Sequence, residues 1–152
     1  MQRHKVRITF PEHRIFSTEL QIRVEDLNYG GHLSNEKLLS YAHETRVRFL
    51  GQHGLKELDI EGVGLIMADA MVRYVSQGHL NEMVRADLYV GTTSEHSFDL
   101  YYRFVREMHR AGSTSSETKY DIAQVKTGMA CFDYSQNKIA RIPLALKQAL
   151  MA

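Results

Sequence analysis

Hydrophobic residues near the first third of the chain recur at helical spacing. At about 100° per residue, one face covering roughly 120° of arc carries Leu38, Leu39, Ala42, Thr45 and Phe49. This pattern predicts a helix from Asn35 to about Gly51 with one buried face. Ser34 or Asn35 would cap its start, because a side-chain oxygen there can accept from the unpaired first-turn N–H groups. Gly51 and Gly54 are the expected stop signals.

The pattern then changes to alternation. Val84, Ala86, Leu88 and Val90 alternate with Met83, Arg85, Asp87 and Tyr89; Phe98, Leu100, Tyr102 and Phe104 share one face, and so do Ala130, Phe132 and Tyr134. Period-two alternation is typical of half-buried strands in an antiparallel sheet. An earlier strand is expected from about Ile15 to Val24, and a short helix at the end of the chain, in "PLALKQALMA".

The predicted order is strand, helix, and then four or so long strands. A lone helix beside that much sheet must cover it, which predicts an α+β fold. Residues 1–152 are short enough to form a single domain. The stretch His109 to Thr118 is rich in Gly, Ser and Thr, and is expected to be a loop between two strands.

Composition excludes several classes of function. The net charge is +1, from 19 basic and 18 acidic residues, so there is no electrostatic case for nucleic acid or an anionic membrane as a partner. Cys131 is the single cysteine, which excludes an internal disulfide and fits a reducing compartment. No apolar run has the length of a membrane span, and the N-terminus lacks a signal-like apolar core. We therefore expect a cytoplasmic protein.

The stretch "DLNYGGHLSN", Asp26 to Asn35, concentrates polar chemistry just before the predicted helix. Gly30 and Gly31 allow close backbone approach and positive φ. A helix N-terminus presents free N–H groups with a partial positive charge, which suits a developing oxyanion. The eight histidines lack the H-x-x-x-H and H-x-H spacings, so we expect neither a metal site nor a cofactor.

With this layout, the motifs resemble those of the hotdog-fold acyl-CoA thioesterases, the 4-hydroxybenzoyl-CoA thioesterase-like group. The signature of that family is approximately D-x-D-x-x-G-H-V-N-N, followed by a helix with E-x-R. The matching residues are Asp26, Gly31, His32, Leu33, Asn35, Glu44 and Arg46, and "RYVSQGHLNEMV" resembles a later family segment with Tyr74 retained. The resemblance covers nearly the whole chain. It implies a hotdog fold, in which a curved antiparallel sheet of about five strands wraps a long central helix.

One departure from the family pattern concerns the chemistry. The usual catalytic aspartate, the second acid of the signature, falls on Asn28. An amide cannot act as a general base near neutral pH, but Asn28 could orient a water or hold the thioester carbonyl. Histidine side chains change charge near neutral pH, so His32 is either a base or carbonyl donor, or a structural residue of the turn. Asp26 either touches the chemistry or braces the loop.

Glu44 is a further candidate carboxylate. It lies away from the apolar stripe of the predicted helix, so it would reach an active site only if a partner subunit packed there; otherwise it is a solvated or interface residue. Arg46 lies inside the apolar arc and needs a buried partner, so we interpret it as structural.

The remaining candidates concern substrate binding. They are Gly30, Gly31, Leu33, Asn35, Tyr74 and Ser76, with Gln77 and His79 along a route for the CoA tail and Arg73 and Arg103 as phosphate partners. Asn35 could instead be only a cap, and Tyr74 only a packing residue.

The leading hypothesis is a metal-independent hydrolase of acyl-CoA or, as a second carrier, acyl-carrier protein. The alternatives are a non-catalytic acyl-CoA binding module, since Asn28 replaces the acid, and a hotdog hydratase or dehydratase. A single unit would leave a sheet edge exposed, so we expect a homodimer or a dimer of dimers.

Overall fold

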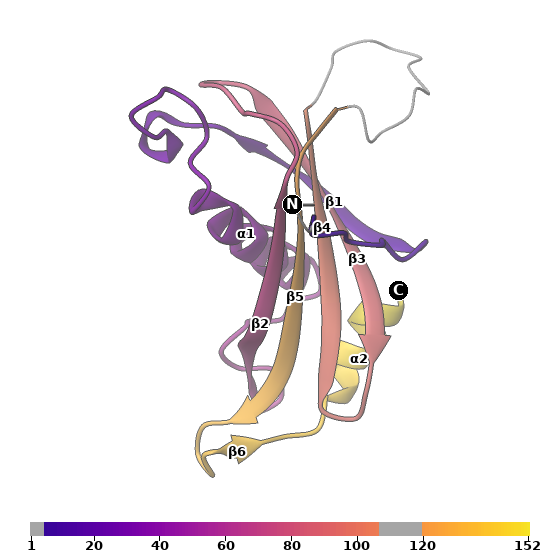
Figure 1. Ribbon diagram of the computed structural model, residues 1–152. Helices are drawn as coiled ribbons and strands as arrows, with labels where there is room; N and C mark the ends of the chain where they lie inside the picture. The colour runs from indigo at the N-terminus through magenta and orange to yellow at the C-terminus, as the bar shows by residue number, and fades with distance from the viewer. Residues whose placement is uncertain (1–4, 107–119) are drawn as a thin grey trace.

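The computed structural model describes residues 5–106 and 120–152. Its elements, in chain order, are β1 (Arg14–Gln21), the 3-10 turn η1 (Val24–Asp26), α1 (Lys37–Gln52), β2 (Gly64–Tyr74), β3 (Met83–Thr93), β4 (Ser97–Arg106), β5 (Asp121–Asp133), β6 (Lys138–Ile139) and α2 (Leu144–Met151) (Figure 1). The loop expected at His109 to Thr118 lies outside the described residues.

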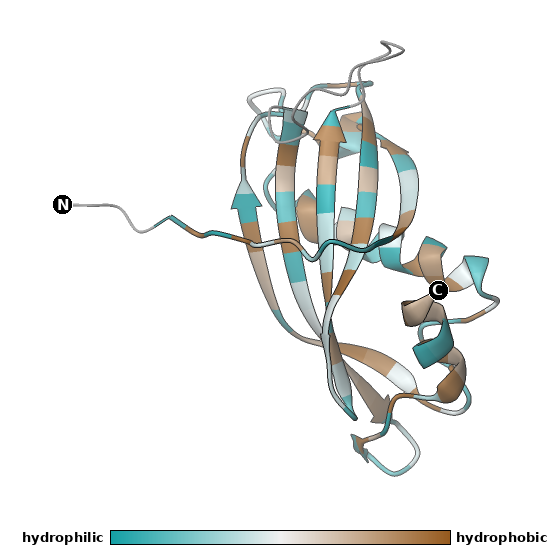
Figure 2. Ribbon diagram, turned by 90° about the vertical axis from the view of Figure 1, so that its right-hand side faces the viewer, coloured by the Kyte–Doolittle hydropathy of each residue, from teal (hydrophilic) through white to brown (hydrophobic). Residues whose placement is uncertain are grey.

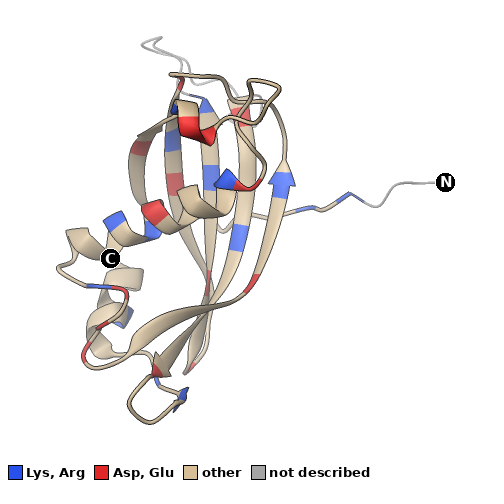
Figure 3. Ribbon diagram, turned by 90° about the vertical axis from the view of Figure 1, so that its left-hand side faces the viewer, with Lys and Arg blue, Asp and Glu red and all other residues tan. Residues whose placement is uncertain are grey.

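All described strands pair antiparallel in one curved sheet. The order is β1-β3-β4-β5-β2, and β6 pairs with β5. The five long strands agree with the expected number, and the short β6 is additional. One face of the sheet is covered by α1, as Figures 1 and 3 show from two directions. The expected arrangement, with a sheet curved around one long helix, is therefore present.

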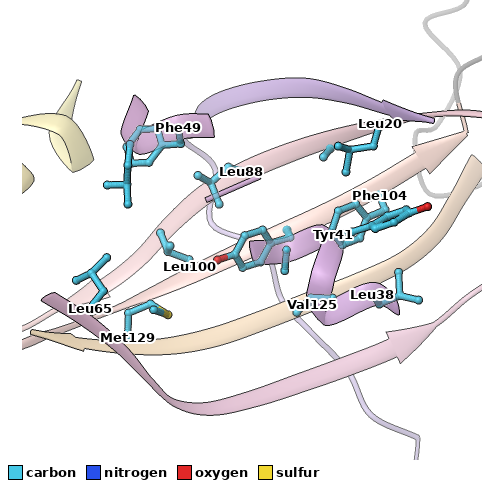
Figure 4. Packing of buried hydrophobic residues seen from close by; sticks show 14 of the residues in the cluster. Leu20, Leu38, Tyr41, Phe49, Leu65, Leu88, Leu100, Phe104, Val125 and Met129 are labelled. Carbon is cyan, nitrogen blue, oxygen red and sulfur yellow. The ribbon is translucent and has the colours of Figure 1, made fainter. Parts of the chain in front are cut away.

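The buried face of α1 differs from the predicted one at a single leucine. Leu38, Ala42, Thr45 and Phe49 are buried, whereas Leu39 is 38% exposed. The face that is covered drifts along the helix: Tyr41 is buried near the start and Leu50 near the end. A curved sheet crosses a straight helix obliquely, so the side that carries Leu39 is covered only toward the C-terminal end of α1. Figure 4 shows Tyr41 and Phe49 pointing into the cluster between helix and sheet.

The strand alternation is confirmed for β3 and β4. Their helix-facing side chains Val84, Ala86, Leu88, Phe98, Leu100, Tyr102 and Phe104 are all at most 2% exposed, and alternating bands of hydropathy cross the strands in Figure 2. The prediction for β5 is wrong in phase. Its fully buried side chains include Val125, Met129 and Cys131, while Tyr134 is 57% exposed. Both phases of β5 carry apolar residues, so periodicity alone could not choose between them.

The outer face of the sheet is partly covered by the N-terminal segment, which crosses the strands in Figure 2. The Phe10 ring lies 5.3 Å from the ring of Tyr89. Asp87, also on this face, is fully buried and accepts hydrogen bonds from Ser17 and Arg14 at 2.8 and 3.4 Å. A buried carboxylate needs such donors, because unpaired burial of its charge is costly.

A polar network fastens α1 to the sheet. The Arg46 guanidinium donates from Nη2 to Glu57 Oε1 at 3.0 Å and from Nη1 to the Tyr102 hydroxyl at 3.1 Å. That hydroxyl lies 3.2 Å from Thr127 Oγ1 on β5. Arg46 thus has the buried partners that its place in the apolar arc requires, in agreement with a structural role.

Two further features complete the fold. Cys131 is fully buried, and this burial raises the pKa of its thiol to about 11. Of the two expected stop signals, Gly51 lies inside α1, whereas Gly54, with φ of 70°, lies just after the helix, and Leu55 N–H closes onto Leu50 O at 2.9 Å. Neither α1 nor α2, in the part of the chain that the structure describes, is long and apolar enough to cross a membrane.

We predict that Arg46→Met lowers the free energy of unfolding by about 2–4 kcal/mol, because it leaves Glu57 and Tyr102 without their buried donor. The control is Arg141→Met, since Arg141 forms an ion pair with Glu95 while its side chain is 78% exposed; that variant should lose less than about 1 kcal/mol. Urea unfolding followed by circular dichroism measures both. Equal losses in the two variants would contradict the structural role of Arg46.

Candidate active site

The polar turn before α1 is organised by Asn28. Its side-chain Oδ1 accepts from the backbone N–H groups of Gly30 and His32 at 3.0 and 3.2 Å. The backbone N–H of Asn28 donates to His32 O at 2.8 Å. Gly31 has a φ of 79°, a conformation that favours glycine. The Asn28 oxygen is therefore engaged within the turn, which leaves only its amide N–H groups to face a ligand.

Asp26 ties this turn to the helix. The side-chain Oδ2 accepts from the Tyr41 hydroxyl at 2.7 Å and from the Arg23 N–H at 3.0 Å, and Asp26 O accepts from the Ser34 N–H at 2.8 Å. Burial, and then the hydrogen bond to Asp26, raise the pKa of Tyr41, so this hydroxyl stays a donor over the ordinary pH range. Of the two roles considered for Asp26, the geometry favours the brace.

The two predicted cap residues, Ser34 and Asn35, do not cap the start of α1 with their side chains. The helix begins at Lys37, and the cap position, Glu36, makes no side-chain cap hydrogen bond. The carbonyls of Ser34 and Asn35 instead accept from the N–H groups of Lys37 and Leu38. Within the described residues, the backbone N–H groups of Asn35 and Glu36 have no hydrogen-bond partner. These are the free donors at the positive end of α1.

A cleft of about 270 Å³ opens beside these donors. Its apolar lining comes from Leu33, Leu38, Val75, Ile122 and Ala123, and its polar lining from Asn35, Tyr74, Ser76 and Gln77. The Tyr74 hydroxyl donates to Asn35 O at 3.3 Å, so the end of β2 lies against the start of the helix. The structure thus brings four of the predicted substrate-binding residues, Leu33, Asn35, Tyr74 and Ser76, to one cleft.

Several cleft residues were not predicted from the sequence. Ile122 and Ala123 belong to the start of β5, and only tertiary pairing places them beside α1. Gly78 had a signal that could have been recognised, an isolated glycine after a strand pattern. A Cβ at Gly78 would lie 2.6 Å from Ile22 Cδ1 and 3.1 Å from Leu33 Cβ. Glycine therefore lets this segment pack closely against the polar turn.

The two predicted carboxylates line a different cleft. Asp26 and Glu44 border a space of about 290 Å³ with Lys37, Ser40 and Tyr41 on another side of α1. Glu44 is 52% exposed in its side chain and pairs with Arg48 at 2.9 Å, so it points away from the core as predicted. Acidic and basic segments accordingly lie close together along α1 in Figure 3. Within one subunit, Glu44 does not line the cleft beside Asn35.

The two arginines considered as phosphate partners differ. Arg103 donates to Asp121 Oδ2 at 3.0 Å with a side chain 14% exposed, and its guanidinium lies over the Phe10 ring. Because it is engaged on the outer face of the sheet, the geometry does not favour Arg103 as a phosphate partner. Arg73 is exposed near the end of β2 and has no side-chain partner among the described residues.

The two histidines beside the cleft lie together. His32 and His79 form an isolated β-bridge, and their rings meet edge to face with centroids 5.2 Å apart. His79 Nδ1 lies 2.7 Å from Glu82 Oε1. For residues 5–106 and 120–152, no group of His, Cys, Asp and Glu side chains is arranged to hold a metal ion.

Several solved structures that are similar to this one are of thioesterases. A 1,4-dihydroxy-2-naphthoyl-CoA thioesterase from Synechocystis matches with a TM-score of 0.76 at 19% identity, covering 90% of this chain and 95% of that one. The dynemicin thioesterase matches with a TM-score of 0.77 at 17% identity, covering 91% and 96%. A gentisyl-coenzyme A thioesterase matches with a TM-score of 0.73 at 14% identity, covering 89% and 99%. At these identities the likeness is evidence for the fold alone.

The sequence itself provides the family assignment. No curated protein matches the chain significantly. The family model of the thioesterase-like superfamily, however, matches residues 22–150, which span the polar turn, the helix and every strand after it. The chain therefore belongs to the thioesterase-like superfamily and has its α+β hotdog fold.

Proposed function

We propose that the protein hydrolyses acyl thioesters of coenzyme A. The observation that supports this most directly is the cleft that Asn35 and Leu38 line at the start of α1, next to the free N–H groups of Asn35 and Glu36. In a cleft with apolar walls, such donors suit a thioester carbonyl, whose oxygen becomes negative when water attacks.

The reaction needs a pocket for the acyl group, donors for the carbonyl oxygen and an attacking water at this place. The acyl group would lie against Leu38, Val75 and Ile122, and the carbonyl oxygen would face the Asn35 and Glu36 N–H groups. Water adds to the carbonyl carbon, and the carbon–sulfur bond then breaks to release the thiol. Oxyanion donors of this kind contribute about 10²–10³ each to the rate in well-studied hydrolases.

The named relatives support a coenzyme A carrier. Two of the similar structures are thioesterases of aromatic acyl-CoA substrates, a dihydroxynaphthoyl and a gentisyl thioester. We extend to this chain only the shared part of those substrates, the CoA thioester.

A non-catalytic acyl-CoA binding module is the second candidate. It is favoured by one observation: Asn28 replaces the acid, and its oxygen is engaged by Gly30 and His32. Both candidates use the same cleft, but only the hydrolase releases thiol.

We further propose a homodimer that forms through β2. This strand is an end strand of the sheet and pairs only with β5 among the described strands. Unpaired strand edges favour association. Met67, Met71 and Tyr74 on β2 are 46%, 42% and 52% exposed, so an apolar surface accompanies the free edge.

The hydrolase predicts release of free thiol from a panel of acyl-CoA thioesters, followed with a thiol reagent. Val75→Trp, which fills the cleft from a position 40% exposed, should lower kcat/KM about tenfold or more, since it obstructs the acyl group. Leu144→Trp, at a position 64% exposed and outside the cleft, should leave kcat/KM unchanged. Thermal stabilisation by acyl-CoA without any thiol release would support the binding module instead.

The role of Asn28 predicts a contrast between two substitutions. Asn28→Ala removes the acceptor for two backbone N–H groups and should lower kcat about tenfold, because the start of α1 loses its rigid turn. Asn28→Asp keeps an acceptor oxygen at the same place and should retain kcat within about threefold, as expected when a hydrogen bond is preserved rather than lost. If both variants lose kcat equally, the Asn28 amide N–H groups are needed by the substrate, and the turn interpretation is wrong.

If the protein dimerises through β2, the double variant Met67→Lys/Met71→Lys should be monomeric at micromolar concentration, because the added charges oppose edge pairing. Light scattering after size exclusion measures the mass of each variant. Met151→Lys, at a position 82% exposed on α2, is the control and should remain dimeric. A monomeric wild type would refute the proposed dimer.

A further inference from the structure

A histidine and a carboxylate form a pair just after Gln77 and Gly78, which line the cleft. His79 Nδ1 lies 2.7 Å from Glu82 Oε1, with side chains that are 55% and 23% exposed. A carboxylate at Nδ1 favours the tautomer that carries its proton there, which leaves Nε2 as a proton acceptor. The pair therefore has the form of an oriented base, in which one ring nitrogen is held and the other is free.

The turn between the two residues is rigidly closed. Asn81 has a φ of 67°, and its N–H donates to Ile22 O at 2.9 Å. The His79 N–H donates to Glu82 Oε1 at 2.7 Å, and the Glu82 N–H returns to His79 O at 3.1 Å. Arg106 donates to the other carboxylate oxygen of Glu82. The carboxylate is thus fixed from both sides before any substrate arrives.

The electrostatics of Glu82 agree with this arrangement. Desolvation acts to raise the pKa of Glu82, but hydrogen bonds from Arg106 and His79 outweigh it, so the pKa lies below its ordinary value. Glu82 is therefore ionised throughout the neutral range. Among residues 5–106 and 120–152, the ionisable groups seen in contact with the His79 ring are Glu82 and His32, and Arg106 contacts the Glu82 carboxylate.

The pair adjoins the cleft through its backbone. His79 directly follows Gln77 and Gly78, which line the cleft, and Gly78 O accepts from the Leu33 N–H at 2.8 Å. The same bridge sets the His79 ring against His32. The histidine–carboxylate pair thus directly follows two of the residues that line the cleft.

The other candidates for a base are each engaged or displaced. The Asp26 carboxylate accepts from Tyr41 and Arg23, and Glu44 pairs with Arg48 beside the second cleft. Asn28 has no proton-accepting group for this chemistry. The His32 ring has no hydrogen-bond partner in the part of the chain that the structure describes, so nothing there selects its tautomer.

We propose that His79 is the general base of the thioester hydrolysis and that Glu82 is its positioning residue, an inference that rests on the proposed function. His79 Nε2 removes a proton from water as the water oxygen bonds to the carbonyl carbon, and the carbonyl electron pair moves to the oxygen. When the intermediate collapses, the carbon–sulfur bond breaks and its electron pair leaves on sulfur. The His79 imidazolium returns the proton to the thiolate, so acid and thiol are released and the base is restored.

The test compares His79→Asn with His32→Asn on a substrate that the wild type hydrolyses. Asparagine can still donate to Glu82 from the position of Nδ1, so the turn is preserved while the base is lost. His79→Asn should lower kcat about 100-fold or more, with KM within about threefold and an unchanged unfolding midpoint. His32→Asn, which removes the competing candidate for the base, should lower kcat less than about fivefold.

The role of Glu82 has its own readout. Glu82→Gln keeps an acceptor for His79 but removes the charge that holds the proton on Nδ1, so kcat should fall while KM and the unfolding midpoint stay unchanged. A lowered unfolding midpoint with an unchanged kcat would show that Glu82 is structural only.

The possible failures are distinguishable. If the wild type hydrolyses acyl-CoA and His79→Asn keeps its kcat, the base assignment is refuted while the proposed function stands. If His32→Asn is the variant that loses kcat, the base is His32. A wild type that releases no thiol from any acyl-CoA refutes both proposals.

Discussion

The site depends above all on the buried carboxylate of Asp26. It accepts from the Tyr41 hydroxyl of α1 and from the Arg23 N–H, and in this way it joins the segment before the helix to the helix itself. The Ser34 N–H on Asp26 O then sets the direction in which the chain enters α1. Without this attachment, the N–H groups of Asn35 and Glu36 at the start of α1 would have no fixed orientation, and an unfixed donor gains little over water in stabilising charge.

The sequence predicts the fold well where one period dominates. The alternation of β3 and β4 is confirmed because each strand has one strongly apolar face. Prediction from the sequence fails where the local pattern is ambiguous, or where distant contacts decide which side chains are buried. On β5 both phases are apolar, and Leu39 is exposed because the oblique path of the sheet selects which side of α1 is covered. The predicted caps fail because backbone carbonyls of Ser34 and Asn35, rather than their side chains, close the first turn.

The candidate site likewise contains residues that the sequence predicted and residues that only tertiary pairing brings to it. Leu33, Asn35, Tyr74 and Ser76 were predicted from the motifs, and they meet at one cleft. The walls formed by Ile122 and Ala123 follow from the pairing of β2 with β5, which no local pattern reveals. The approach of Glu82 to His79 needs the left-handed backbone at Asn81, and a three-residue spacing outside a helix does not predict it. Local motifs thus identify parts of a site, whereas tertiary pairing decides which parts meet.

The burial of the single cysteine affects whether the protein can react with the thiol that the proposed reaction releases. Under the proposed reaction, every turnover sets free a thiol, and a thiol can exchange into mixed disulfides with accessible cysteines through its thiolate. Cys131 is fully buried, and its pKa of about 11 keeps it protonated at neutral pH. Its sulfur is therefore protected from the coenzyme that the cleft would discharge, and the protein would not accumulate covalent adducts of its own product.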